Sequence, residues 1–73
     1  MSPAFPVVSG PDAVKALTRG GFEQVSQRGS HVKLRSADGR VVILPLHREL
    51  ARGTLGSILR QAGLSVDEFV GLL

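Results

Sequence analysis

The chain has 73 residues, enough for one small domain that buries roughly 60% of its unfolded surface, so an enclosed pocket for a small metabolite is not expected. It has no cysteine, which excludes disulfides and thiolate metal sites. It also has no apolar run long enough to span a membrane and no secretory signal, so we expect a soluble cytoplasmic protein. Nine Lys and Arg against six Asp and Glu give a net charge of +3, and all nine lie between Lys15 and Arg60, which suits either nucleic-acid contact or an ordinary basic surface.

The N-terminal part of the chain predicts a loose segment and then a helix. Residues 1–8 carry two prolines and no hydrophobic period, so we expect a flexible lead-in there and a single domain over residues 9–73. Ser9 can cap a helix whose first turn holds Asp12, and Gly20-Gly21 can end it. Its apolar face has helical spacing and consists of Ala13, Val14 and Leu17.

Three strands are predicted next, joined by two turns. Phe22–Arg28 is the weakest of them, whereas His31–Arg35 alternates cleanly between apolar and polar residues. Val41–Leu44 is a mostly β-branched run, and the proline after it cannot donate to a ladder. Gly29-Ser30 and Asp38-Gly39 mark the turns, the second because both of its residues can adopt a positive φ. The pattern predicts an antiparallel meander.

Two helices are predicted after the strands. Thr54 is expected to cap the first, which Gly63 ends. Its core-facing residues have i, i+3, i+4, i+7 spacing and are Leu55, Ile58, Leu59 and Ala62. Ser65 and Glu68 form a capping box for a short second helix, whose apolar residues Val66, Phe69, Val70 and Leu73 can fold back onto the core. The expected class is α+β, in the order α-β-β-β-α with a short extra helix, and with one sheet face free to bind.

His31 is the strongest candidate for chemistry. Strand parity places it with Lys33 and Arg35 on the face opposite the apolar residues of its strand, and Arg28 lies just across the turn. Metal-free RNA cleavage needs a group that moves protons beside cations that stabilise the phosphorane. A histidine among cations meets that need, although an ordinary exposed strand histidine has the same pattern.

Two further positions could contact RNA. In an antiparallel meander the end of the third strand lies near the start of the second, which could bring His47 close to His31. The two imidazoles could then divide the acid and base roles, or His47 could be an unrelated loop residue. The helix start at Gly53-Thr54 offers backbone amides to a phosphate oxygen, as any capped helix does.

Several segments, taken in order, resemble the HicA (YcfA-like) toxins. These are Gly21-Phe22, Gly29-Ser30-His31, Val41 to His47, Gly53-Thr54-Leu55 and Ile58 to Ser65, so that the resemblance extends from about Ser9 to Leu73. It implies a double-stranded-RNA-binding-like fold and cleavage of mRNA without a metal ion or other cofactor. It also implies a HicB-type antitoxin as partner, and it places the family's essential histidine at His31, presented by Gly29 and Ser30.

The resemblance leaves two functions to compare. One is a ribonuclease toxin with His31 as its catalytic residue, and the other is a non-catalytic RNA-binding module of similar fold. Tyr and Trp are absent from the chain, so we expect RNA contacts to be mostly with phosphate and shape. The residues expected to make them are Arg28, Gly29, Ser30, Lys33, Arg35, His47 and Thr54. The free toxin is expected to be a monomer.

Overall fold

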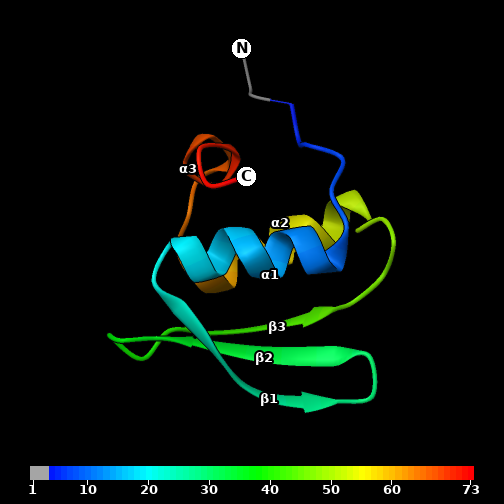
Figure 1. The fold of residues 1–73 in the computed structure, drawn as a ribbon. Coiled ribbons are helices and arrows are strands. Elements are labelled where there is room, and N and C mark those ends of the chain that lie inside the picture. The colour runs from blue at the N-terminus through cyan, green and yellow to red at the C-terminus, as the bar shows by residue number, and fades with distance from the viewer. Residues whose placement is uncertain (1–3) are drawn as a thin grey trace.

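The computed structural model describes residues 4–73, which fold into one sheet covered by helices on one face (Figure 1). The elements are α1 (Gly10–Arg19), β1 (Phe22–Arg28), β2 (His31–Ser36), β3 (Val41–Pro45), α2 (Arg52–Ala62) and α3 (Val66–Val70). The strands pair antiparallel in the order β1-β2-β3. This order of elements and the α+β class are as predicted.

The sheet register sets which side chains share a face. Arg28 pairs with His31 and Ser26 pairs with Lys33 across β1 and β2, and on the other side of β2 Lys33 pairs with Ile43. Between Gln24 and Ser26 the register slips by one residue, so that β1 has a bulge there. A bulge adds one residue to one strand and increases its local twist.

The core lies between the inner sheet face and the helices. Alternation along β2 and β3 points four side chains inward, namely Val32, Leu34, Val42 and Leu44, each at most 1% exposed. The predicted apolar face of α2 meets them and is also buried, as are Ala13 and Leu17 of α1 and Phe69 of α3. The other three apolar residues that the sequence places on the core are less buried than Phe69: Val66 is half-buried, and Val70 and Leu73 are 45% and 47% exposed.

The start of α1 lies unusually close to the end of β3. Ser9 caps the helix as predicted, its side chain accepting from the Asp12 N–H at 3.1 Å. The Gly10 N–H donates to the His47 carbonyl oxygen at 2.8 Å. A Cβ at Gly10 would lie 2.2 Å from the Pro45 carbonyl oxygen. Only glycine allows this approach, which joins the first helix to the strand end that pairs with His31.

Three local expectations need correction. Thr54 is not a helix cap, because α2 begins at Arg52 and its N-cap is Ala51, which makes no side-chain cap bond. Of the Asp38-Gly39 pair only the glycine has a positive φ, and the loop is longer than two residues. The expected loose lead-in is also wrong for Val8, which is 7% exposed in the core and whose carbonyl accepts from Leu50; Met1–Pro3 lie outside the described residues.

Candidate functional site

The turn between β1 and β2 positions the candidate histidine. Gly29 has a φ of +59°, and it is the first central residue of a two-residue hairpin, where glycine supplies a positive φ without steric cost. The turn is held to the loop after β3, since the Leu46 N–H donates to the Ser30 carbonyl oxygen at 2.7 Å. His31 follows directly as the first residue of β2.

The predicted parity of β2 is confirmed. His31, Lys33 and Arg35 are exposed on the outer sheet face, and the residues between them are buried. The helices cover the inner face and leave this outer face open (Figure 1). Arg28 pairs directly with His31 and therefore lies on the same face. The structure thus brings together the four outer-face residues that the sequence singled out.

A shallow groove runs across this face, which we call the His31 groove. It has a volume of about 340 Å³ and is lined by Ser26, Arg28, His31, Val32, Lys33 and Ile43. All three strands contribute to it. The sequence missed Ser26 and Ile43, because β1 had no clear period and Val41–Leu44 is apolar on both faces. Ile43 is 52% exposed, so the groove has one apolar wall beside its cations.

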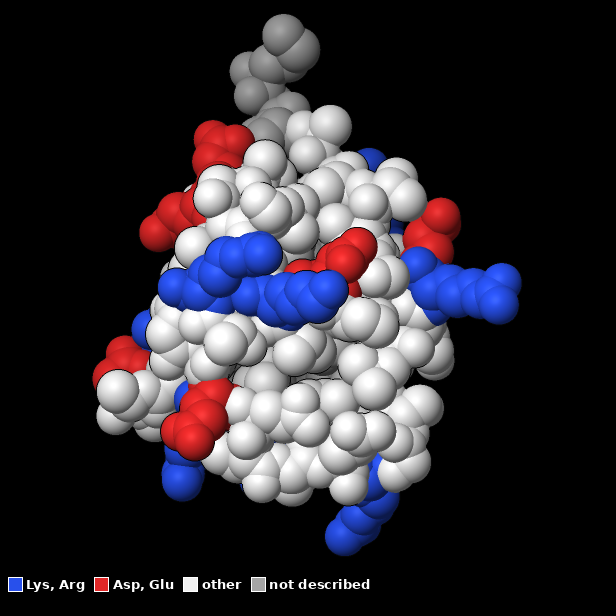
Figure 2. Space-filling model, in the orientation of Figure 1, with Lys and Arg blue, Asp and Glu red and all other residues white. Residues whose placement is uncertain are grey.

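Among residues 4–73, no carboxylate pairs with the cations of the groove. In the described part of the chain the one ion pair joins Arg40 to Asp38 at 2.9 Å, at the far end of β2. Glu23 is the acidic residue on the outer face, and it pairs with Arg35 rather than with Arg28 or Lys33. In Figure 2, Lys and Arg side chains extend from the sheet side of the molecule. Arg28 and Lys33 are therefore available to a phosphate.

His47 and Thr54 lie at the same end of the molecule but do not line the groove. The Gly29–Ser30 turn, the end of β3 and the starts of α1 and α2 all gather at this end (Figure 1). His47 is exposed, and its main chain is bonded to Gly10. Thr54 is half-buried in the first turn of α2. The segment that carries His47 therefore lies near the turn before His31, as the meander predicts, but the His47 side chain is not part of the groove.

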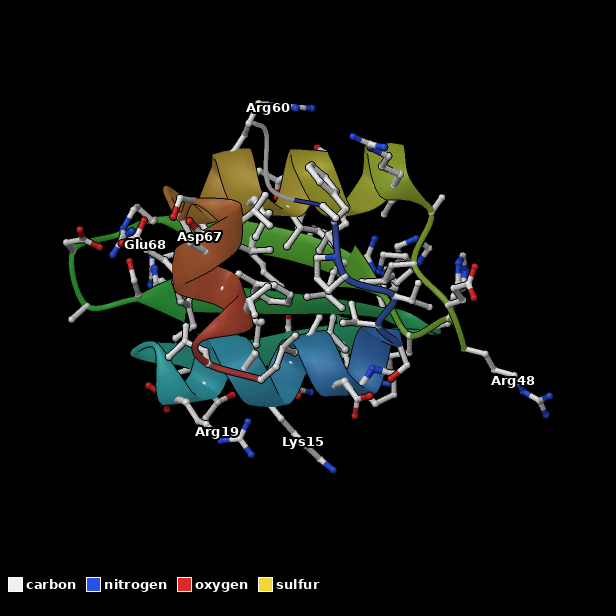
Figure 3. All side chains as sticks on the ribbon, turned by 90° about the horizontal axis from the view of Figure 1, so that it is seen from above. Lys15, Arg19, Arg48, Arg60, Asp67 and Glu68 are labelled. Carbon is white, nitrogen blue, oxygen red and sulfur yellow. The ribbon has the colours of Figure 1, made fainter. Side chains whose placement is uncertain are left out.

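A second hollow lies beside α1, between this helix and the two ends of the described chain. It has a volume of about 410 Å³ and is lined by Val7, Val8, Asp12, Lys15, Arg19 and Leu73. Figure 3 shows the labelled Lys15 and Arg19 extending outward from α1, and Asp67 and Glu68 on α3, away from Arg48. Although this hollow is larger, it contains no histidine to move a proton. The His31 groove is therefore the better candidate for chemistry.

Two other kinds of feature are absent from residues 4–73. Within that range, no group of three or more His, Asp or Glu side chains is placed to hold a metal ion. Among the helices described, none has the length and apolar character needed to cross a membrane.

Comparison with known proteins gives a family and a structural neighbour. The sequence model of the family described as "HicA toxin of bacterial toxin-antitoxin" matches residues 10–64. A solved chain from a toxin–antitoxin complex of Streptococcus pneumoniae is 34% identical, with a TM-score of 0.67, over 78% of this chain and 98% of that chain. No curated protein matches the chain. The α+β architecture is consistent with the double-stranded-RNA-binding-like fold that the sequence predicts.

Proposed function

The chain belongs to the HicA toxin family of bacterial toxin–antitoxin systems, and on that premise we propose that it is an endoribonuclease that cleaves messenger RNA without a metal ion. The observation that carries the proposal is His31, exposed in a groove beside the unpaired cations Arg28 and Lys33. Its partner is a HicB-type antitoxin, in keeping with the toxin–antitoxin complex that contains the similar chain. Its place of action is the cytoplasm.

The proposed reaction uses the RNA's own 2′-hydroxyl as nucleophile. That oxygen attacks the adjacent phosphorus, and the bond from phosphorus to the 5′-oxygen breaks. The products are a 2′,3′-cyclic phosphate and a 5′-hydroxyl end. The nucleophile loses one proton and the leaving oxygen gains one, so no water is consumed. His31 is proposed to carry one of these transfers, which imidazole does well near neutral pH.

The other residues of the outer face bind the strand. Arg28 and Lys33 stabilise the negative charge that grows on the phosphorane oxygens, because cations act most strongly where charge develops. Gly29 and Ser30 hold the turn that presents His31, and the turn's exposed main chain is open to the RNA. Further backbone contacts are proposed for Arg35, His47 and Thr54.

A turnover assay tests the proposal. Excess RNA is incubated with the protein in EDTA, and the expected result is cleavage that His31→Ala strongly slows and His47→Ala slows less. RNA that is bound but stays intact would favour a non-catalytic RNA-binding module instead. A substrate with an activated leaving group separates the two roles of His31. If His31 is the acid, the loss in His31→Ala shrinks on that substrate, whereas the loss persists if it is the base.

A further inference from the structure

The two edges of the sheet differ in how open their main chains are. At the β3 edge the Ile43 N–H donates to Gln61 Oε1 of α2 at 3.0 Å, and Pro45 has no N–H to offer. The Gln61 amide is itself held by Ser57 of the same helix at 3.2 Å. This edge is therefore closed to a further strand by the protein's own side chains.

Among residues 4–73, no side chain bonds to the outer main-chain groups of β1 in this way. Because the Ile43 N–H points away from β2, the backbone groups of Lys33 opposite it must point toward β1. The alternation along the ladder then turns Ser26 and Arg28 toward β2, and it turns the N–H groups of Gln24 and Gln27 outward. Every β1 residue after Phe22 is exposed. Unpaired main-chain groups in a row are a template for another strand.

The composition of this edge does little to repel a partner. Proteins commonly blunt free edges with lysine or proline, yet the four residues from Gln24 to Gln27 are uncharged, and Val25 is 46% exposed. The surface over β1 in Figure 2 is accordingly mostly white. The bulge spaces the outward N–H groups of Gln24 and Gln27 three residues apart instead of two, which favours a short or bulged partner strand over a long regular one.

The edge also adjoins the proposed active site. Ser26 and Arg28 of β1 form one side of the His31 groove. A strand added beside β1 would place alternate side chains on the outer face, next to Arg28. Since Arg28 and Lys33 have no carboxylate partner among the described residues, acidic side chains at those positions would find complementary charge.

We propose that the antitoxin adds an extended segment, acidic on one face, to the β1 edge between Glu23 and Arg28, as a fourth strand of the sheet. Main-chain bonds to Gln24 and Gln27 hold the segment, and its acidic side chains cover the groove and pair with Arg28. This inference rests on the antitoxin partnership of the proposed function but not on RNA cleavage. Its experiments therefore use His31→Ala toxin without RNA, so that a failure of the nuclease assignment leaves their result intact.

Proline substitutions test the main-chain contacts directly. Gln24→Pro and Gln27→Pro each remove an outward N–H and none of the bonds to β2, a replacement that edge strands tolerate. Gln24→Ala and Gln27→Ala are the matched controls, because they shorten the same side chains and keep the N–H. The binding partner is the purified antitoxin encoded beside this toxin, and affinity is measured by calorimetry. We expect each proline to weaken binding of the antitoxin at least tenfold relative to its alanine control. We also expect the affinity of the Arg28→Ala variant for the antitoxin to depend less on salt than the affinity of the protein that retains Arg28.

Hydrogen exchange on the His31→Ala toxin without a proline substitution tests the proposal even if a proline variant unfolds. The Gln24 and Gln27 amides should exchange rapidly in the free toxin and become protected when antitoxin is added. Folded proline variants that bind as tightly as their alanine controls would overturn the proposal. So would amides that stay unprotected in the complex. Protection that grows with toxin concentration alone, together with dimers in size-exclusion chromatography, would assign the edge to a second copy and also overturn it.

Discussion

His31 is exposed, makes no contribution to the core and lies between cations, so its removal separates chemistry from folding. We expect His31→Ala to lower the rate of RNA cleavage by about 10²–10⁴-fold, the usual contribution of a general acid or base. The free energy of unfolding should change by less than about 0.5 kcal/mol, as for most surface substitutions. Single-turnover cleavage and urea unfolding measure the two effects. Full cleavage by the folded variant would remove His31 from the mechanism.

Lys33 and Lys15 form a matched pair of exposed lysines on opposite sides of the molecule. Lys33→Ala should reduce the slope of log affinity for RNA against log salt by about one, because one phosphate contact is lost. Lys15→Ala should leave that slope unchanged. Filter binding at several salt concentrations measures both. Equal effects at the two sites would mean that RNA does not select the outer sheet face.

The sheet face on which a single residue lies is predictable from the sequence wherever apolar and polar residues alternate. His31 and Val32 were assigned to opposite faces from parity alone, and the structure confirms both. Ile43 could not be assigned in the same way, since each neighbour in Val41–Leu44 is also apolar. Its exposure follows from pairing with Lys33, which is a property of the register and not of the strand itself.

Among the elements, α1 meets β3 through the close approach of Gly10 to Pro45. Gly10→Ala places a Cβ 2.2 Å from a carbonyl oxygen, so the backbone must shift, and we expect a loss of about 1–3 kcal/mol from overpacking. Cleavage should fall as well, because Pro45 pairs with His31. Gly53→Ala is the control, since a Cβ there meets nothing within 4 Å and should stabilise α2 by up to about 1 kcal/mol. Thermal unfolding compares the two, and similar shifts would contradict this account.

Two exposed carboxylates make the element ends sensitive to acid. Bonds from Ser36 and then Arg40 lower the pKa of Asp38, and the backbone N–H of Ser65 lowers the pKa of Glu68 at the start of α3. The unfolded chain then binds more protons than the folded one at acid pH, so stability rises with pH.

This stabilisation should be complete above the ordinary values of 3.8 and 4.5, and it should be lost as the pH falls through the lowered folded values. Unfolding midpoints measured from pH 6 down to pH 2 test the expectation. Asp38→Asn and Glu68→Gln should each flatten the profile in that range, whereas Glu49→Gln, at a carboxylate with no side-chain bond in the described structure, serves as the control. A profile unchanged by either substitution would contradict the assignment.

Element ends were predictable where a side chain supplies the cap. Ser9 and the Ser65–Glu68 box are both confirmed. The start of α2 was placed too late, because Ala51 offers no capping side chain and Thr54 offers a misleading one. Arg52 at that start lies over the Phe5 ring, 4.9 Å from its centroid. Such a contact between residues far apart in sequence has no local signal.

For the whole molecule, the chain order of the core residues has a consequence for when the protein can fold. Six of the core side chains lie after all three strands, and they are Leu50, Leu55, Ile58, Leu59, Ala62 and Phe69. Until they leave the ribosome, the part of the inner sheet face that α2 and α3 cover stays in water, and a domain this small has little stability to spare when part of its core is unburied. Chains stalled at Leu73 on the ribosome should therefore be cut by protease where released chains resist. On the proposed function, we therefore expect RNA cleavage to begin only after the C-terminal helices have left the ribosome and packed on the sheet.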